Sequence, residues 1–212
     1  MHVLALDTAT PEPAVAVSSA ERTYVERLSD GRRASEDLLA AIEACLRLAG
    51  LDLEACDRIA VCSGPGSFTG VRVGLATALG LSRSTGIPVE AVPTLEALAE
   101  AARRPDRLEV ASVLDAGRGE VTIARYSLAG RRAEPVGTPS ACMARPDAAR
   151  YASGADVVSL PASLLPGSRA PEEPVAQALA QAVARAPRAP TEGTAQARYS
   201  RPSAAEEKLG AP

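Results

Sequence analysis

The sequence predicts an α/β protein built from two related lobes. Residues 3–17 (VLALDTATPEPAVAV) resemble residues 110–124 (VASVLDAGRGEVTIA), because each segment has an apolar strand that ends in an aspartate, a turn and a second apolar run. Internal repetition of this kind indicates a duplicated unit. Between the two copies, residues 58–82 read as a strand, a tight glycine turn and a helix, a connection typical of α/β folds.

The elements of the first lobe, residues 1–104, follow from their hydrophobic patterns. Strands are expected at 2–7, 14–19, 22–28, 58–62 and 89–92, and helices at 35–49, at 67–82 and after Thr94, which is expected to cap the third helix. The resulting order of three strands, helix, strand, helix, strand, helix is typical of a ribonuclease-H-like lobe.

The second lobe, residues 105–190, opens with strands expected near 109–115 and 119–127. The pattern then weakens, because residues 130–172 are rich in Pro, Gly, Ala and Ser. A short helix at 146–152, a strand at 156–160 and a helix from Pro174 to Ala186 are expected in the remainder. Residues 191–212 are expected to form a tail that packs back on the protein or is partly disordered.

Composition indicates a cytoplasmic protein without a membrane span or a secretory signal. The net charge is −3, and no run of Lys and Arg forms a nucleic-acid-binding stripe. The four cysteines form no C-x-x-C pair and are expected to be buried in a reducing compartment. His2 is the only histidine, which leaves almost no ligands for a transition metal and no plausible base for a Ser-His-Asp system.

The glycine turn, Ser63-Gly64-Pro65-Gly66, allows two interpretations. A helix that starts near Ser67 suits a bound phosphate. However, no Lys-Ser/Thr pair follows the second glycine, and the glycine spacing does not fit G-x-G-x-x-G. We therefore favour a structural strand–helix connection, and keep a phosphate or nucleotide contact as the second reading. The residues that such a contact would use are Asp7, Gly64, Gly66, Ser67, Asp115 and Gly117.

The two aspartates also have a simpler reading, in which Asp7 and Asp115 only cap their own turns. The small residues Gly70, Gly74 and Ala78 fall on one side of the helix expected at 67–82. Such a face lets another helix approach closely, or it packs on the protein's own sheet. The residues alone leave these two alternatives open.

Three motifs together resemble the bacterial TsaB (YeaZ) family: MHVLALDTAT, GPGSFTGVR and DAGRGEV. In the third motif the arginine is shifted by one place and an aromatic residue is lost. The resemblance extends over residues 1–128, with an echo at Tyr199-Ser200-Arg201. It implies an actin/Hsp70-like (ASKHA) fold with a reduced C-terminal lobe, and support of threonylcarbamoylation of the adenosine next to the tRNA anticodon.

The resemblance also implies the partners. A non-catalytic subunit would dimerise with the catalytic paralogue TsaD, help to recruit the ATPase TsaE, form a homodimer when alone and meet tRNA only indirectly. No catalytic residue, metal or cofactor is expected, with ATP, ADP or magnesium bound only in the assembled complex. The partner interface would lie on the helices at 35–49 and 67–82, at Leu39, Ile42, Leu46, Gly70, Arg72, Gly74 and Ala78.

The alternative is an autonomous actin-like nucleotide-binding enzyme, a small kinase or ATPase. It would need a phosphate-binding hairpin in each lobe. The first hairpin, residues 7–13, has no glycine and carries a carboxylate, whereas the second has two glycines and Arg118. We favour the partner subunit because only one of the two hairpins suits an anion.

Overall fold

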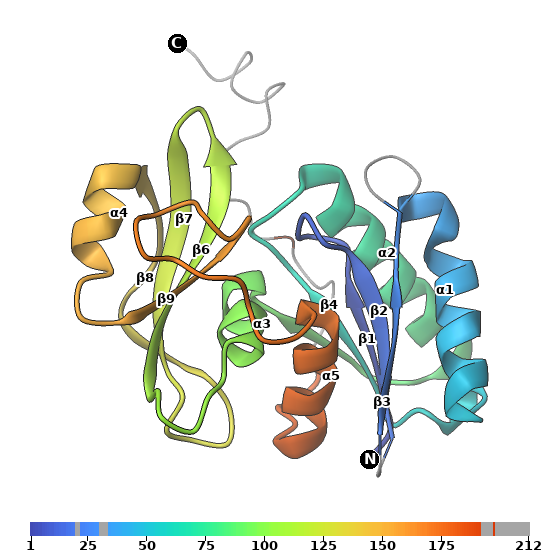
Figure 1. The fold of residues 1–212 in the computed structure, drawn as a ribbon. Coiled ribbons are helices and arrows are strands. Elements are labelled where there is room, and N and C mark those ends of the chain that lie inside the picture. Colours follow the sequence, from blue (N-terminus) through green and yellow to red (C-terminus); the bar gives the residue numbers. More distant parts are fainter. Residues whose placement is uncertain (20–21, 30–33, 192–196, 198–212) are drawn as a thin grey trace.

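The structure, a computed structural model, describes residues 1–19, 22–29, 34–191 and 197. The first lobe is a five-stranded sheet with the order β3-β2-β1-β4-β5 (Figure 1). Its elements are β1 (Val3–Asp7), β2 (Ala14–Ser18), β3 (Thr23–Arg27), α1 (Ala34–Ala49), the 3-10 turn η2 (Leu53–Ala55), β4 (Arg58–Cys62), α2 (Phe68–Thr85), β5 (Val89–Val92) and α3 (Thr94–Ala101). This order confirms the ribonuclease-H-like prediction for the first lobe.

The second lobe is a four-stranded sheet with the order β8-β7-β6-β9. Its elements are β6 (Glu109–Gly117), β7 (Glu120–Ser127), β8 (Glu134–Ala144), α4 (Arg145–Tyr151), β9 (Asp156–Leu160) and α5 (Val175–Arg185). β6 pairs antiparallel with β7 and parallel with β9, as β1 does with β2 and β4. The shared topology confirms the two related lobes, and the four-stranded sheet confirms the reduced second lobe.

The helices bury both faces of the first sheet. α1 and α2 pack on one face, and α5 packs on the other face against β1, β2 and β3 (Figure 1). α5 follows the second lobe in the chain but lies on the first sheet and against α3, so it does not belong structurally to the lobe expected at 105–190. One continuous apolar core therefore includes strands of both sheets, and α4 covers a smaller separate core.

Two sequence-based expectations differ from the structure. Strand β8 was not expected within residues 130–172, because Pro135, Gly137 and a shift of register against β7 interrupt its alternating pattern. Thr94 does not cap α3, since the cap residue is Pro93. Instead, the Thr94 hydroxyl accepts a hydrogen bond from the Gly64 N–H at 3.0 Å, which ties the start of α3 to the glycine turn.

Two expectations fall largely outside the described residues: the tail at 191–212, of which only Thr191 and Ala197 are described, and the motif echo at Tyr199-Ser200-Arg201. Within the described residues, no helix combines the length and apolar character that crossing a membrane requires.

Candidate functional site

The first two sequence motifs meet in space and form one unit, which we call the motif junction (residues 7–10 and 63–70). The Ser67 N–H donates to the Ala9 carbonyl at 2.8 Å. In the other direction, the Thr8 hydroxyl donates to the Gly70 carbonyl at 2.6 Å. The turn after β1 is therefore docked directly on the start of α2, where the Ser67 hydroxyl accepts a hydrogen bond from the Gly70 N–H at 3.2 Å.

Glycines make this docking possible. A Cβ atom added at Gly66 would overlap the Ala9 carbonyl, and one added at Gly70 would overlap the Thr8 carbonyl. The same atom at Gly74 would collide with the Thr8 hydroxyl. The glycines of the motif thus allow two segments of the same chain to approach each other closely. The space beside Gly66 is filled by protein backbone.

Asp7 closes its own turn from inside the protein. Its side chain is fully buried, and Oδ1 accepts hydrogen bonds from the N–H groups of Ala9 and Thr10 at 3.0 and 3.1 Å. Oδ2 accepts from the Thr10 hydroxyl. Burial raises the pKa of Asp7 to about 6, although these hydrogen bonds act in the opposite direction. The simpler reading of Asp7 as a turn cap is therefore correct, and its buried carboxylate is not placed to contact a phosphate.

Asp115 holds the corresponding place in the second lobe but lies nearer the surface. Its side chain is 43% exposed, forms a long ion pair with Arg145 at 3.8 Å and accepts a hydrogen bond from the Gly117 N–H at 3.1 Å. Gly117, Arg118 and Gly119 all have positive φ angles. The Asp115 side chain of this second hairpin is thus partly exposed, whereas the first hairpin packs on the start of α2. Among the described residues, no three His, Cys, Asp or Glu side chains converge into a group able to hold a metal ion.

The small-residue face of α2 points into the protein. Ala78 is fully buried, Gly74 is buried, and Gly70 packs on Thr8. Gly74 and Ala78, which were expected at a partner interface, are therefore buried where α2 packs on β4 and the turn after β1, whereas Gly70 is half-buried. Arg72 lies on an exposed part of α2, with its guanidinium 3.7 Å from the ring centroid of Phe68.

An open hollow of about 630 Å³ lies between α1, η2 and the later part of α2. Leu39 projects beside it with 58% of its surface exposed, whereas Ile42 and Leu46 are almost buried beneath it. Leu51 and Leu53 also line the hollow but were not predicted as site residues. The signal that could have found them is the occurrence of two leucines directly after the turn at Gly50. The apolar residues that line this hollow, which we call the α1 groove, are Leu39, Ile42, Leu46, Leu51, Leu53 and Leu81.

The chain is similar in sequence to known proteins. The family described as TsaD: tRNA N6-adenosine threonylcarbamoyltransferase matches residues 29–158. The tRNA threonylcarbamoyladenosine biosynthesis protein TsaB of Haemophilus influenzae is 39% identical over 123 residues (57% of this chain, 52% of that protein), and its Escherichia coli counterpart is 34% identical over 127 residues (59% and 55%). The chain thus spans about half the length of these curated relatives.

Solved structures extend the similarity over both lobes. YeaZ from Pseudomonas aeruginosa is 29% identical with a TM-score of 0.73, covering 93% of this chain and 99% of that one. An uncharacterised protein with similarity to the peptidase YeaZ, also from Pseudomonas aeruginosa, is 30% identical with a TM-score of 0.72, covering 86% of this chain and 90% of that one. With its two docked motifs and its two related lobes, the chain belongs to the TsaB (YeaZ) family.

Proposed function

We propose that this protein is a non-catalytic partner subunit that supports threonylcarbamoylation of the adenosine next to the tRNA anticodon. In this role it binds a TsaD-type catalytic subunit, and the assembled complex engages the ATPase TsaE and the tRNA. The names of the curated relatives place the family in this biosynthesis. The protein is proposed to act in the cytoplasm, where tRNA is modified, and to form a homodimer when no partner is present.

The observation that carries the non-catalytic role is the motif junction. A nucleotide-binding lobe needs open backbone N–H groups and space where the phosphates lie. In this chain the Ser67 N–H already donates a hydrogen bond to the Ala9 carbonyl, so it is not open to a phosphate. The backbone of Ala9 also fills the space beside Gly66. The buried Asp7 carboxylate faces the same turn and would repel an anion. These features favour a structural use of the motif over an autonomous kinase or ATPase.

The α1 groove is the proposed binding site for the TsaD-type partner. Leu39 is one of the most exposed large apolar side chains of the described residues, and it stands at the rim of an apolar hollow. Exposed apolar surface next to a hollow is typical of an interface. Arg72 remains a proposed contact on the exposed side of α2, and Ile42 and Leu46 support the groove from below.

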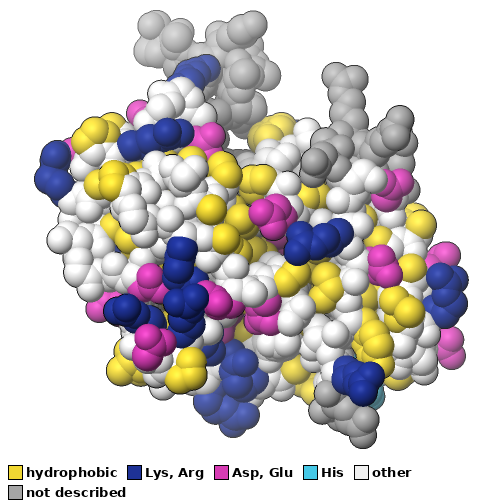
Figure 2. Space-filling model, viewed as in Figure 1, with side chains coloured by type: hydrophobic (Ala, Val, Ile, Leu, Met, Phe, Trp, Pro, Cys, Tyr) yellow, Lys and Arg dark blue, Asp and Glu magenta, His cyan; other side chains and the backbone are white. Residues whose placement is uncertain are grey.

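Contact with tRNA is proposed to occur only through the complex. On the face shown in Figure 2, the described arginines are interspersed with aspartates and glutamates, and they form no continuous basic stripe there. Several arginines of the second lobe are in ion pairs, including those at 125, 145, 150 and 169. An arginine whose charge is already balanced by a carboxylate attracts a phosphate less strongly than an unpaired one. This distribution favours indirect contact with RNA.

Replacement of Leu39 by glutamate tests the proposed interface. A charge at the rim of an apolar interface should weaken binding to the host's TsaD by at least about tenfold, as for a typical hot-spot residue. Leu48→Glu is the matched control, because Leu48 is similarly exposed (54%) on the opposite side of the same helix. The measurement is co-purification with TsaD and TsaE, followed by titration calorimetry.

Equal binding by the Leu39→Glu and Leu48→Glu variants would move the interface away from the α1 groove. Failure of the unaltered protein to co-purify with TsaD would overturn the partner role itself. Turnover of ATP at about 1 s⁻¹ or faster by the isolated protein, within the usual enzymatic range, would overturn its non-catalytic character.

A further inference from the structure

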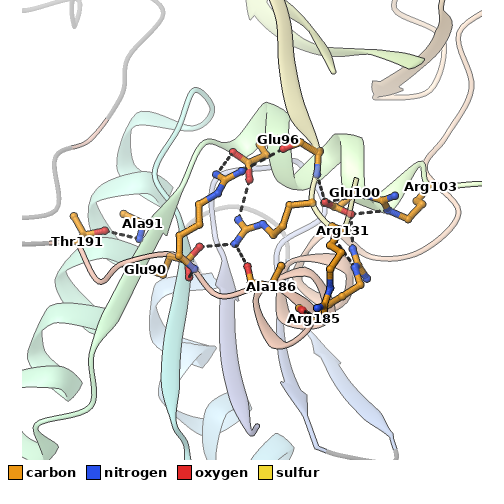
Figure 3. Close-up of polar contacts among 12 residues, drawn as sticks. Glu90, Ala91, Glu96, Glu100, Arg103, Arg131, Arg185, Ala186 and Thr191 are labelled. Carbon is orange, nitrogen blue, oxygen red and sulfur yellow. Dashed lines mark hydrogen bonds and ion pairs between the residues drawn. The ribbon is translucent and has the colours of Figure 1, made fainter. Parts of the chain in front are cut away.

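A network of buried charges joins the two lobes on the side of α3 (Figure 3). Its acidic members are Glu90 of β5 and Glu96 and Glu100 of α3, each at most 4% exposed. All three belong to the first lobe. Buried carboxylates occur almost only where charged partners satisfy them. Here the charged partners other than Arg103 come from distant parts of the chain.

Arg132, in the β7–β8 connection of the second lobe, reaches across to the first lobe. Its side chain is 5% exposed, and its Nη1 and Nη2 atoms donate to Glu90 at 2.5 Å and Glu96 at 2.8 Å. Nη1 also donates to the Ala186 carbonyl at 3.2 Å. Burial alone would lower the pKa of Arg132, but the two carboxylates outweigh it and raise that pKa. One buried cation therefore joins β5, α3 and the end of α5.

Arg188 completes the same cluster from the segment that follows α5. Its backbone N–H donates to Glu90 at 3.1 Å, and its guanidinium donates to Glu96 at 2.9 Å and to the Ala133 carbonyl at 3.3 Å. The segment then runs along the free edge of β5, where the Thr191 N–H donates to the Val89 carbonyl at 2.8 Å. Residues 186–191 thus contact both the β7–β8 connection of the second lobe and strand β5 of the first sheet.

Glu100 forms a second cluster next to the first. It accepts hydrogen bonds from the Ala133 N–H, from Arg103 at 2.9 Å and from Arg185 at 2.8 Å. Arg103 also donates to the Leu128 carbonyl at 2.5 Å. Both ends of the connection at 128–133 are therefore held by charged side chains of the first lobe and of α5.

Buried ion pairs add little net stability, because removing charges from water costs about as much as their attraction returns. Their better supported use is to specify one arrangement. The chain crosses between the lobes twice, at residues 102–108 and 161–174, and a rotation of the lobes about these crossings would separate Arg132 from Glu90 and Glu96. We propose that this network, which we call the lobe lock, holds the two lobes at one fixed angle, so that the protein does not close around a nucleotide.

The test measures the angle between the lobes in the full chain. Spin labels are introduced through non-natural residues at Ser84 in α2 and Ser153 after α4, both exposed. The distance between them is then recorded by pulsed electron resonance with and without magnesium and ATP. The unaltered protein should give one narrow distance distribution that magnesium and ATP leave unchanged, whereas Arg132→Met should broaden it or add a second peak.

Arg125→Met is the matched control, because Arg125 pairs with Glu109 inside the second lobe alone. It should keep the narrow distribution. If Arg132→Met does not fold, Arg188→Gln replaces it, since the Arg188 side chain is 45% exposed. A narrow distribution in the folded lock variant, or a shift of the unaltered protein on adding magnesium and ATP, would overturn the proposal. This result is independent of binding to TsaD.

Discussion

The two hairpins that follow the first strand of each lobe have the same topology and opposite environments. Asp7 occupies the last paired position before its turn, opposite Ala14, whereas Asp115 lies opposite Val121 and one more pair, Gly117 with Glu120, follows it. Asp7 is fully buried within the motif junction, whereas the Asp115 side chain is 43% exposed. The first turn is docked on the start of α2, and the second bends back through residues with positive φ angles.

The difference shows that the hairpin of the first lobe has a structural role, because it packs on the start of α2. In the first lobe, the glycines that would suit an anion instead leave room for the backbone of Thr8 and Ala9 to pack against them. In the second lobe, added Cβ atoms at Gly117 and Gly119 would meet nothing within 4 Å. Glycine in the first lobe provides close approach, and glycine in the second provides only a backbone conformation. The shared topology of the two hairpins therefore does not determine the use of either one.

The largest effect is expected from Gly70→Ala. The new Cβ would overlap the Thr8 carbonyl, a backbone atom that cannot move without displacing the turn after β1. We expect a loss of at least about 3 kcal/mol in the free energy of unfolding, at the upper end of overpacking effects. Urea unfolding followed by circular dichroism measures this loss.

Gly80→Ala is its matched control in the same helix. A Cβ at Gly80 would meet nothing within 4 Å, so the variant should gain up to about 1 kcal/mol from helix propensity. A Gly70→Ala variant that is as stable as Gly80→Ala would show that the two motifs are not docked in solution, and the contrast between the two hairpins would disappear.

The second effect concerns the buried charge of Asp7. Its pKa rises from 3.8 to about 6 in the folded protein, so the folded state holds a proton that the unfolded state has lost between these pH values. Stability should therefore be fully present below pH 4 and fall as the pH rises to 6, by up to about 3 kcal/mol from this group. Asp7→Asn, which mimics the protonated acid, should match the unaltered protein at pH 4 and exceed it at pH 7.

Urea unfolding of both proteins at intervals between pH 4 and pH 7 measures this difference. If Asp7→Asn is instead the less stable protein at pH 7, the hydrogen bonds from Ala9 and Thr10 stabilise the carboxylate more than burial destabilises it. Asp7 would then be a favourable cap, and the buried hairpin would not differ from the exposed one in this respect.

The sequence was sufficient to predict the first lobe because its strands are short apolar runs and its turns carry strong signals. The strands at 58–62 and 89–92 agree with the structure at both ends, and α2 begins directly after Ser67, close to the expected start. The direction of the Gly70, Gly74 and Ala78 face was not predictable, because small residues allow close approach to a partner or to the protein's own sheet. The position of Thr8, which lies 62 residues before Gly70 in the chain, decides between them.

The lobe lock was equally hidden from sequence reasoning. Glu90, Glu96 and Glu100 look like ordinary surface residues of a strand and a helix, and Arg132 and Arg188 are far away in the chain. A buried ion pair has no local pattern, since its partners are brought together by packing alone. Strand β8 was missed for a different reason, because Pro and Gly break its period of two.

The smallest effect is expected in the exposed hairpin, where Arg118 is the only described residue other than glycine with a positive φ, at 54°. Two-residue turns with this backbone favour asparagine followed by glycine, and Gly119 already follows. Arg118→Asn should therefore raise the free energy of unfolding by up to about 1 kcal/mol, as measured by thermal unfolding. A clear loss of stability would instead mean that contacts of the Arg118 side chain outweigh its backbone strain, and that the second hairpin is held by its side chains as the first is held by its backbone.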